Sequence, residues 1–402
     1  MKTDFDLVVA GGGPAGTMAG LLFARAGCRV QILEKHPDFL RDFRGDTVHP
    51  STLEILHQLG MLERFLERPH SRIDHVRLHI AGRERIIGDL SHLDTPAPFV
   101  AMMPQWDFLD FLRDEASAWP GFHLEMAAPV KEFLQDSGKI SGVRLKDGRE
   151  ASARLTIAAD GRDSLVRKGL LPVETLGAPM DVLWFRVAKP DPGGEAIRCS
   201  FERGRLIVLI DRGDYWQCAL VIPKGKAEEL KAMGIDRIRA IVAAGAPDLD
   251  LSDLDEIEDL KLLSVSLDRL TRWHRPGLLA IGDAAHAMSP IGGIGINLAI
   301  QDSVAAANLL AAPLAQGEDI GPLLGKVQKR RYWPTRLIQA GQKAAQEQII
   351  GRLLEPGPPL EKAPLAVRLL DRFPILRRIP GRLIGLGIRR EKMASPDSGK
   401  TA

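Results

Sequence analysis

Three glycine- and aspartate-containing motifs, far apart in the chain, carry residue types suited to binding a dinucleotide. The first is Gly11-Gly12-Gly13-Pro14-Ala15-Gly16, the second is Asp160-Gly161, and the third is Gly282-Asp283 followed by a glycine-rich run. Glycine lets a backbone approach a phosphate or a flat ring closely, and a carboxylate accepts hydrogen bonds from sugar hydroxyls. In this order, the three motifs together predict one bound FAD that is contacted by distant segments.

The first motif lies between an expected strand at residues 5–10 and an expected helix at residues 17–25. Glycines suit the tight turn, the close approach of a pyrophosphate and the packing of helix on strand, and the helix N-terminus offers free N–H groups. A second strand, residues 28–33, ends at Glu34, whose carboxylate can bind an adenosine ribose. This motif alone does not separate NAD from FAD. It assigns to the cofactor site Gly11, Gly13, Pro14, Ala15, Gly16, Glu34 and Lys35.

The third motif, GDAAHAMSPIGGIGINLAIQD, spans residues 282–302 and follows an expected strand at residues 277–281. An aspartate at the carboxyl end of a parallel strand can reach a ribityl hydroxyl. The helix expected at residues 296–310 points its positive end at the ring, where a reduced flavin carries negative charge. We expect the Asn297 side chain at the pyrimidine edge and interpret His286 as a packed histidine. The assigned residues are Gly282, Asp283, Pro290, Gly293, Gly295, Ile296 and Asn297.

The second motif identifies the family that these residues resemble. Asp160-Gly161 alone is more often an ordinary turn, but Ser164 and Arg167 follow it at the spacing of group A FAD-dependent aromatic monooxygenases. Over about its first 340 residues the chain resembles these p-hydroxybenzoate hydroxylase-like flavoproteins. The resemblance implies that Asp160, Arg44 and Gln105 contact the cofactor. It also implies that the Pro290 backbone lies beside the flavin, with its carbonyl on the substrate.

The same resemblance implies a reaction. FAD reduced by NADPH or NADH would react with O2 to give a C4a-hydroperoxide, which would hydroxylate or epoxidise an aromatic or polyene-like small molecule. No second GxGxxG occurs, so we expect the nicotinamide to dock transiently. We name no catalytic base: the chain has only two tyrosines, Tyr215 and Tyr332, and the candidates His49, His75 and His79 are interpreted as surface or structural residues.

Three alternative functions are compatible with the same scaffold. A halogenase is disfavoured because Trp216–Pro223 lacks the second tryptophan of a WxWxIP sequence. A reductase of the geranylgeranyl type stays open, as does a non-catalytic FAD-binding protein. Neither the substrate, the choice between NADH and NADPH nor the oligomeric state follows from the residues.

The strand–loop–helix motifs and the resemblance predict an α/β protein, and a length of 402 residues predicts at least two domains. A Rossmann-like FAD-binding domain of the hydroxylase (GR2) type should comprise residues 1–70, 101–170 and 276–345, interwoven with a β-sheet substrate domain at residues 71–100 and 171–275. The cysteines Cys28, Cys199 and Cys218 have no CxxC spacing, so we expect neither disulfides nor a metal site. We expect a cytoplasmic protein, because no signal peptide or membrane span is evident.

The last part, residues 346–402, is expected to be a basic helical region. Residues 326–402 hold 17 Lys or Arg and 6 Asp or Glu, although the whole chain has a net charge of only +2. We favour helices packed on the body with solvated arginines over contact with an anionic membrane, because Pro374, Pro380 and Gly381 divide the segment into short pieces. Nucleic acid is not expected as a partner.

Overall fold

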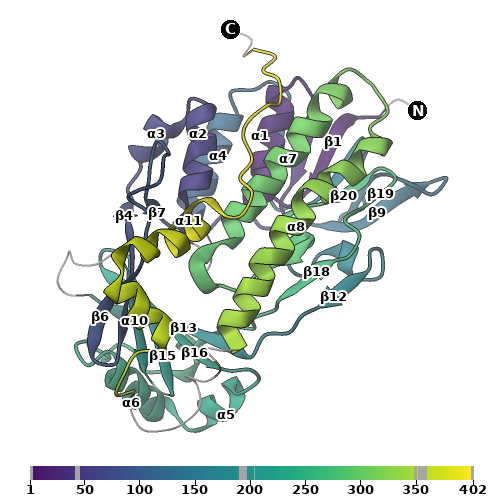
Figure 1. Cartoon of the computed structure of the whole chain (residues 1–402). Coiled ribbons are helices and arrows are strands. Elements are labelled where there is room, and N and C mark those ends of the chain that lie inside the picture. The colour runs from purple at the N-terminus through teal and green to yellow at the C-terminus, as the bar shows by residue number, and fades with distance from the viewer. Residues whose placement is uncertain are drawn as a thin grey trace.

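The computed structural model describes residues 3–40, 46–189, 197–202, 204–347, 351 and 360–399. Two large sheets occupy opposite ends of the molecule, and the long helix α8 (Gly321–Ala345) runs from one end towards the other (Figure 1). The mixed α/β architecture confirms the predicted fold class. One sheet, with helices on it, carries the glycine motifs, and the other faces the loop around Ile291, within the third motif.

The first sheet has eight strands and a parallel centre in the order β20-β11-β1-β2-β8. Because neighbouring parallel strands end at the same edge, the loops after β1, β11 and β20 come together there. These are the loops that contain the three motifs. The strands are β1 (Phe5–Ala10), β2 (Val30–Leu33), β8 (Phe122–Glu125), β9 (Val130–Asp136), β10 (Lys139–Leu145), β11 (Glu150–Ala158), β19 (His274–Arg275) and β20 (Leu278–Ala280).

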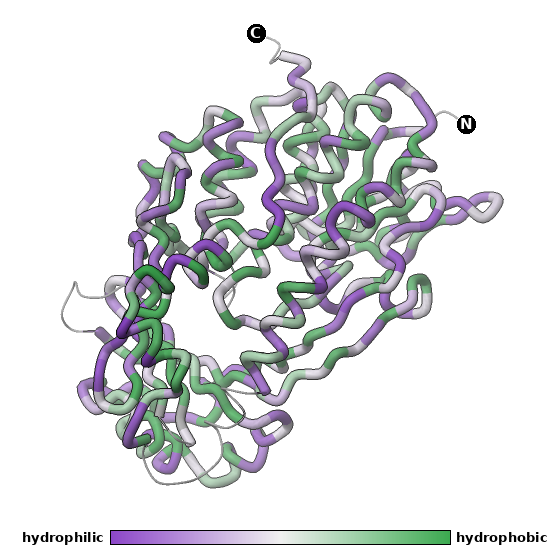
Figure 2. The backbone as a smooth tube through the Cα atoms, viewed as in Figure 1, coloured by the Kyte–Doolittle hydropathy of each residue, from purple (hydrophilic) through white to green (hydrophobic). Residues whose placement is uncertain are grey.

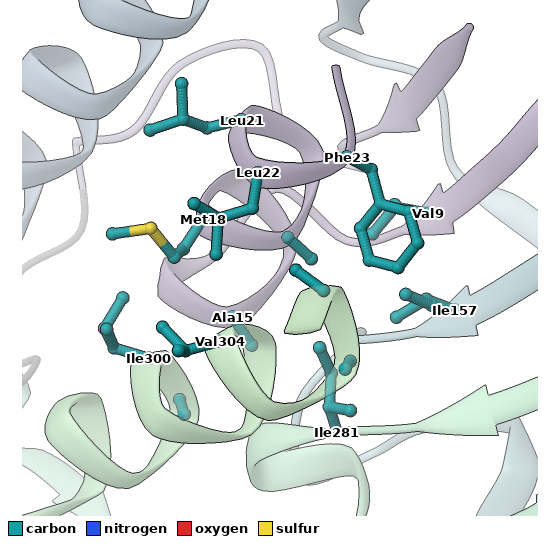
Figure 3. Close-up of a cluster of buried hydrophobic side chains, with 14 of the residues drawn as sticks. Val9, Ala15, Met18, Leu21, Leu22, Phe23, Ile157, Ile281, Ile300 and Val304 are labelled. Carbon is teal, nitrogen blue, oxygen red and sulfur yellow. The ribbon is translucent and has the colours of Figure 1, made fainter. Parts of the chain in front are cut away.

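Helices α1 (Pro14–Arg25) and α7 (Gly295–Ala315) pack against each other beside this sheet (Figure 3). Met18 and Leu22 of α1 lie with Ile300 and Val304 of α7 in one buried cluster. A region containing α7, Ile291–Ala315, is long and apolar enough to cross a membrane, but 72% of its most apolar window is buried inside the protein, as in a core helix. The helices α2 (Pro50–Gln58), α3 (Leu62–Leu66) and α4 (Gln105–Ala116) complete this side.

The second sheet has seven strands in the order β17-β13-β16-β15-β14-β5-β6. Helices α5 (Ala227–Ala232) and α6 (Ile235–Gly245) contribute to the apolar cluster on one of its faces. Trp184 and Val182 belong to a separate apolar cluster on the other face. The strands are β5 (His75–Ile80), β6 (Arg83–Asp89), β13 (Met180–Ala188), β14 (Ile197–Glu202), β15 (Arg205–Asp211), β16 (Tyr215–Pro223) and β17 (Lys261–Leu263).

Two three-stranded sheets lie beside the large ones. One joins β12 (Val173–Thr175), β18 (Asp268–Leu270) and β21 (His286–Ala287), and the other joins β3 (Thr47–Val48), β7 (Val100–Met102) and β4 (Ser71–Ile73). Strand β21 begins three residues after Asp283, and β3 lies between Asp46 and His49. Pairing within these small sheets therefore holds the neighbouring loop residues in place.

The C-terminal segment lies along the body of the protein (yellow in Figure 1). It forms α10 (Leu365–Arg372), a 3₁₀ turn at Pro374–Arg377 and α11 (Arg378–Leu386), and both helices contact β6. Residues 387–399, which we call the strap, then run along α7 and α1. The Asn308 amide donates to the Lys392 carbonyl at 2.8 Å, and the Ser398 N–H donates to the Arg25 carbonyl at 2.9 Å.

Candidate cofactor and active site

The first glycine loop has no room for a side chain at Gly11 and Gly16, and it faces empty space at Gly13. A Cβ on Gly11, whose φ is +107°, would lie 2.4 Å from the Ala159 carbonyl oxygen, and one on Gly16 would lie 1.9 Å from the Gly11 carbonyl oxygen. A Cβ on Gly13 would meet no atom within 4 Å. Gly13 is the N-cap of α1 and Pro14 is its first residue. The open side of this loop is therefore the positive end of a helix, which suits a pyrophosphate.

Glu34 is held at the end of β2 by backbone groups. Its Oε2 accepts from the Gly12 N–H at 2.8 Å and its Oε1 accepts from the His36 N–H at 3.1 Å. Each carboxylate oxygen keeps a further lone pair for a hydroxyl group. Lys35 is exposed beside it. Arg44, expected to contact the cofactor, lies outside the described residues.

Gln105 opens α4 next to a buried acidic residue that the sequence did not reveal. The Gln105 backbone N–H donates to the carboxylate of Asp46, which is also paired with Arg212 from the turn between β15 and β16. Burial raises the pKa of Asp46 to about 6, against the opposing effect of the Arg212 guanidinium. This ion pair connects the loop before β3 with the second sheet.

The second and third motifs meet through Arg167. Its Nη2 donates to the Asp283 carbonyl at 2.8 Å, its Nε donates to the Ala284 carbonyl at 3.0 Å, and its Nη1 pairs with Asp268. Asp160 accepts from the Leu165 N–H at 2.9 Å through Oδ2, and burial raises the pKa of its carboxyl. Arg167, six positions after Gly161, thus holds the loop at Gly282-Asp283 in place.

The Asp283 carboxylate is one-third exposed, and its Oδ2 pairs with Arg162 Nε at 3.1 Å. Arg162 also donates through Nη2 to the Met288 carbonyl at 3.1 Å. Its Nη1 is buried and has no hydrogen-bond partner within the described residues. A buried N–H of this kind is costly unless something binds it. Arg162 and Asp283 together therefore present a donor and an acceptor to a polyol ligand.

The loop after Pro290 leads into the N-terminus of α7. Gly292 and Gly293 have φ of +77° and +61°, and the Gly293 N–H donates to the Pro290 carbonyl at 3.0 Å. The first intrahelical bond runs from the Leu298 N–H to the Ile294 carbonyl. The N–H groups of the three preceding residues, 295–297, therefore have no partner inside the helix. A Cβ on Gly295 would meet no atom within 4 Å, so this helix end also faces open space.

The Asn297 side chain has a different role from the expected contact with a pyrimidine ring. Its Oδ1 accepts from the His49 N–H at 2.9 Å and from Thr52 Oγ1 at 2.7 Å. Its Nδ2 donates to the carbonyls of Thr47 at 3.2 Å and Gly293 at 3.4 Å. These four bonds use the full capacity of the amide. The side chain joins α7 to the start of α2, and contact of Ile296 and Asn297 with a flavin ring stays a prediction.

Behind the GD loop lies a buried charged network that the sequence analysis missed. Asp302 Oδ2 accepts from the Gly282 N–H at 3.1 Å and contacts His286 Nε2 at 2.6 Å, and its Oδ1 pairs with Arg331 Nε at 3.0 Å. Arg331 Nη1 also reaches Glu391 of the strap at 3.3 Å. Burial alone would raise the pKa of Asp302, but His286 and Arg331 hold it below its ordinary value. Only the aspartate at the end of the third motif hinted at this network.

The histidines considered as bases make contacts that suit structural roles. His286 is buried, with its ring 5.0 Å from that of Trp273. His49 is also buried, and this burial lowers its pKa to about 4. Its Nδ1 lies 2.7 Å from the Ile384 carbonyl. His75 Nδ1 lies 2.8 Å from Asp74, and His79 is exposed on β5. Of the tyrosines, Tyr215 has the Arg186 guanidinium over its ring, and Tyr332 contacts Trp273 edge to face.

The arrangement fits FAD. Two open helix N-termini can face its anionic groups, Glu34 and the Asp283–Arg162 pair can bind its sugar hydroxyls, and the Arg162 Nη1 still has a hydrogen to donate. The groups lie at the ends of β1, β2, β11 and β20, and their loops contact one another.

Comparisons with known proteins agree with this site. The family model described as "FAD binding domain" matches residues 4–339. The 6-methylpretetramide 4-monooxygenase of Streptomyces rimosus is 34% identical over 336 residues, covering 81% of this chain and 80% of that protein. The para-nitrophenol 4-monooxygenase of a Pseudomonas species is 24% identical, covering 79% of this chain and 80% of that protein.

Solved structures share the fold. PqsL, a probable FAD-dependent monooxygenase from Pseudomonas aeruginosa, has a TM-score of 0.73 at 23% identity, covering 87% of this chain and 98% of that chain. The p-nitrophenol 4-monooxygenase PnpA from Pseudomonas putida has a TM-score of 0.73 at 20% identity, covering 96% of this chain and 95% of that chain. The chain belongs to the FAD-binding domain family, and it is an FAD-dependent oxidoreductase of the monooxygenase type.

Proposed function

We propose that this monooxygenase oxygenates an apolar aromatic small molecule bound between the seven-stranded sheet and the loop after the GD motif. The observation that carries the proposal is the packing of Ile291, in that loop, against the apolar cluster on one face of the sheet. The members of this cluster include Met180, Val182, Trp184, Leu206, Ile210, Ala219 and Val221. A substrate lying here would contact mostly carbon.

The named relatives support an aromatic substrate. One acts on 6-methylpretetramide and another on para-nitrophenol. On this basis we propose residues 71–100 and 171–275 as the substrate domain, because they supply all seven strands of that sheet. The cofactor domain would then comprise residues 1–70, 101–170 and 276–345. A cytoplasmic location suits the three free cysteines.

Bound FAD, reduced by NADPH or NADH, would supply the oxygen chemistry. The chain's residues would bind it and shape its surroundings. The α1 N-terminus at Gly13 would hold the pyrophosphate, Glu34 with Lys35 nearby the adenosine end, and Asp283 with Arg162 the ribityl chain. The N–H groups at residues 295–297 would stabilise negative charge at the pyrimidine edge. The apolar sheet face would exclude water from the reacting atoms.

A coupled assay tests the proposal. Purified protein, loaded with FAD, should oxidise NADPH or NADH with matching O2 uptake when a phenol or polycyclic phenol is added. Under ¹⁸O2 the product should gain one labelled oxygen atom. Saturation of a polyene without O2 would instead favour the reductase alternative. Retention of FAD with no NAD(P)H oxidation over the whole panel would favour a non-catalytic flavin-binding protein.

A further inference from the structure

The outer side of α10 and α11 presents an apolar ridge beside a row of arginines. Six apolar side chains there are between 43% and 68% exposed: Leu365, Leu369, Phe373, Ile375, Ile379 and Leu383. Figure 2 shows hydrophobic and hydrophilic residues mixed along this segment. Large apolar side chains seldom gather on the surface of a protein unless the surface binds something. We call these six residues the C-terminal ridge.

The arginines follow the ridge with a regular spacing. In α10, an arginine lies three positions after each apolar ridge residue, at Arg368 and Arg372. In the 3₁₀ turn and α11 the same spacing places Arg378 and Arg382 after Ile375 and Ile379. All four arginines are exposed. Residues three apart lie on neighbouring parts of a helix surface, so the cations flank the apolar side chains. Arg368, Arg378 and Arg382 make no ion pair or hydrogen bond within the described residues.

Other arginines of the same segment are committed to the fold. Arg377 donates to the carbonyls of Leu370 and Asp371 at 2.9 and 3.2 Å, and Arg390 pairs with Glu54 at 2.9 Å. Within the two helices and the turn between them, the arginines without such contacts, Arg368, Arg378 and Arg382, are exposed and lie beside the ridge.

The opposite side of these helices is fixed to the body. A Cβ on Gly381 would lie 1.8 Å from the Asp89 carbonyl oxygen, and one on Gly385 would lie 2.6 Å from Leu93. In α10, Val367 packs on Leu78 and Ile80, and Asp371 pairs with Arg85. Short helices are marginal in isolation, and this argued against a membrane-binding segment at the level of sequence. Here tertiary packing holds them in helical form, so that objection does not apply.

We propose that the C-terminal ridge docks the enzyme on an anionic lipid surface. The charge supports this occupant: between residues 365 and 386 there are five arginines and one aspartate. A two-fold contact with a second copy would place these cations against one another, which is unfavourable. Side chains such as leucine and isoleucine insert between lipid headgroups, while arginines reach the phosphates. This proposal does not depend on which substrate the enzyme oxidises.

Sedimentation with lipid vesicles tests it on the full-length FAD-loaded protein. The protein should pellet with vesicles of phosphatidylcholine containing about a third phosphatidylserine, should bind pure phosphatidylcholine much less, and should be released by high salt. Replacing Arg368, Arg378 and Arg382 together by Gln should weaken binding about a hundredfold, from ~1 kcal/mol per basic residue. The double change Leu369→Ser with Ile379→Ser should also abolish pelleting.

Matched controls come from other exposed positions. Lys131→Gln with Lys146→Gln removes exposed charges elsewhere, and Leu262→Ser removes a 45% exposed apolar side chain from β17. These variants should bind as the parent does, and all variants should keep their flavin absorbance. The proposal is overturned if the parent does not pellet at low salt, if the ridge variants bind like the controls, or if ultracentrifugation shows a dimer that the ridge variants dissociate.

Discussion

Neutralising Asp302 alone should destabilise the protein more than neutralising Asp302 and Arg331 together. The two side chains are 0% and 1% exposed and lie 3.0 Å apart. Asp302→Asn leaves the guanidinium buried with Glu391 at 3.3 Å, and Arg330 also pairs with Glu391 at 2.6 Å, so the cluster gains a net positive charge. Removing one partner of a buried ion pair costs about 3–5 kcal/mol.

Arg331→Met should cost a similar amount, because Asp302 and Glu391 lose the cation that they share and keep only His286 and Arg330 as partners. The double variant leaves the neutral Arg330–Glu391 pair. Its loss of unfolding free energy should therefore be much smaller than the sum of the losses in the two single variants. With an unfolding entropy of about 2.1 cal/mol/K per residue, each single change should lower Tm by roughly 4–6 °C. The assay is thermal unfolding followed by circular dichroism and by release of flavin fluorescence.

Asp302→Asn should release FAD more readily as well, because the Gly282 N–H loses its charged acceptor. Lys343→Met, with Lys343 and Glu347 3.8 Å apart on the surface of α8, serves as the control and should change Tm by less than about 1 °C. Additive losses in the double variant would show that Asp302 and Arg331 do not depend on each other, and the network would have to be described as independent contacts.

Three further changes test the site. Asp283→Ala should weaken FAD binding about ten- to a hundredfold, from roughly 1.5–3 kcal/mol for a lost charged acceptor, and unchanged affinity in equilibrium dialysis would remove Asp283 from the site. Since the pKa of His49 falls to about 4 when folded, stability should decline by about 2 kcal/mol from pH 7 to pH 5, and His49→Gln should lose this pH dependence in urea titrations. Arg212→Met leaves Asp46, whose pKa is already raised to about 6, without its cation; stability should then fall more steeply than in the parent as pH rises from 5 to 8, and a parallel pH profile would contradict this.

The fold and the family could be predicted because their determinants are local. Gly11 and Gly16 are required by backbone atoms that a Cβ would meet at 2.4 and 1.9 Å, and such requirements appear directly as residue types at fixed spacing. The order of the three motifs then specified one cofactor. Arg167 was recognised from its spacing to Asp160, although its physical role, holding the carbonyls of the GD loop, required the structure.

The Asn297 interactions could not be predicted, because each amide has several possible partners. Its location at the start of α7 was correct, but three of its four bonds go to residues about 250 positions earlier. The length of chain between them leaves no sequence pattern. The pairing of Asp46 with Arg212 was hidden for the same reason, since the two residues lie in loops far apart in the sequence.

The basic C-terminal region shows why charge counts alone were insufficient. From the sequence, residues 346–402 form one segment that either packs on the body or contacts a membrane. In the structure the segment has two parts with different surroundings, the helices α10 and α11 and the strap. The strap places Glu391 against Arg331, and Arg331 holds Asp302, which accepts from the Gly282 N–H of the GD loop. The ridge keeps its arginines in solvent. Ile384, which is not part of the ridge, accepts from the buried His49 ring, and the His49 N–H donates to Asn297, so it is the inner side of α11 that is joined to the start of α7. Loss of the strap should therefore weaken FAD retention, whereas substitutions on the ridge should leave it unchanged.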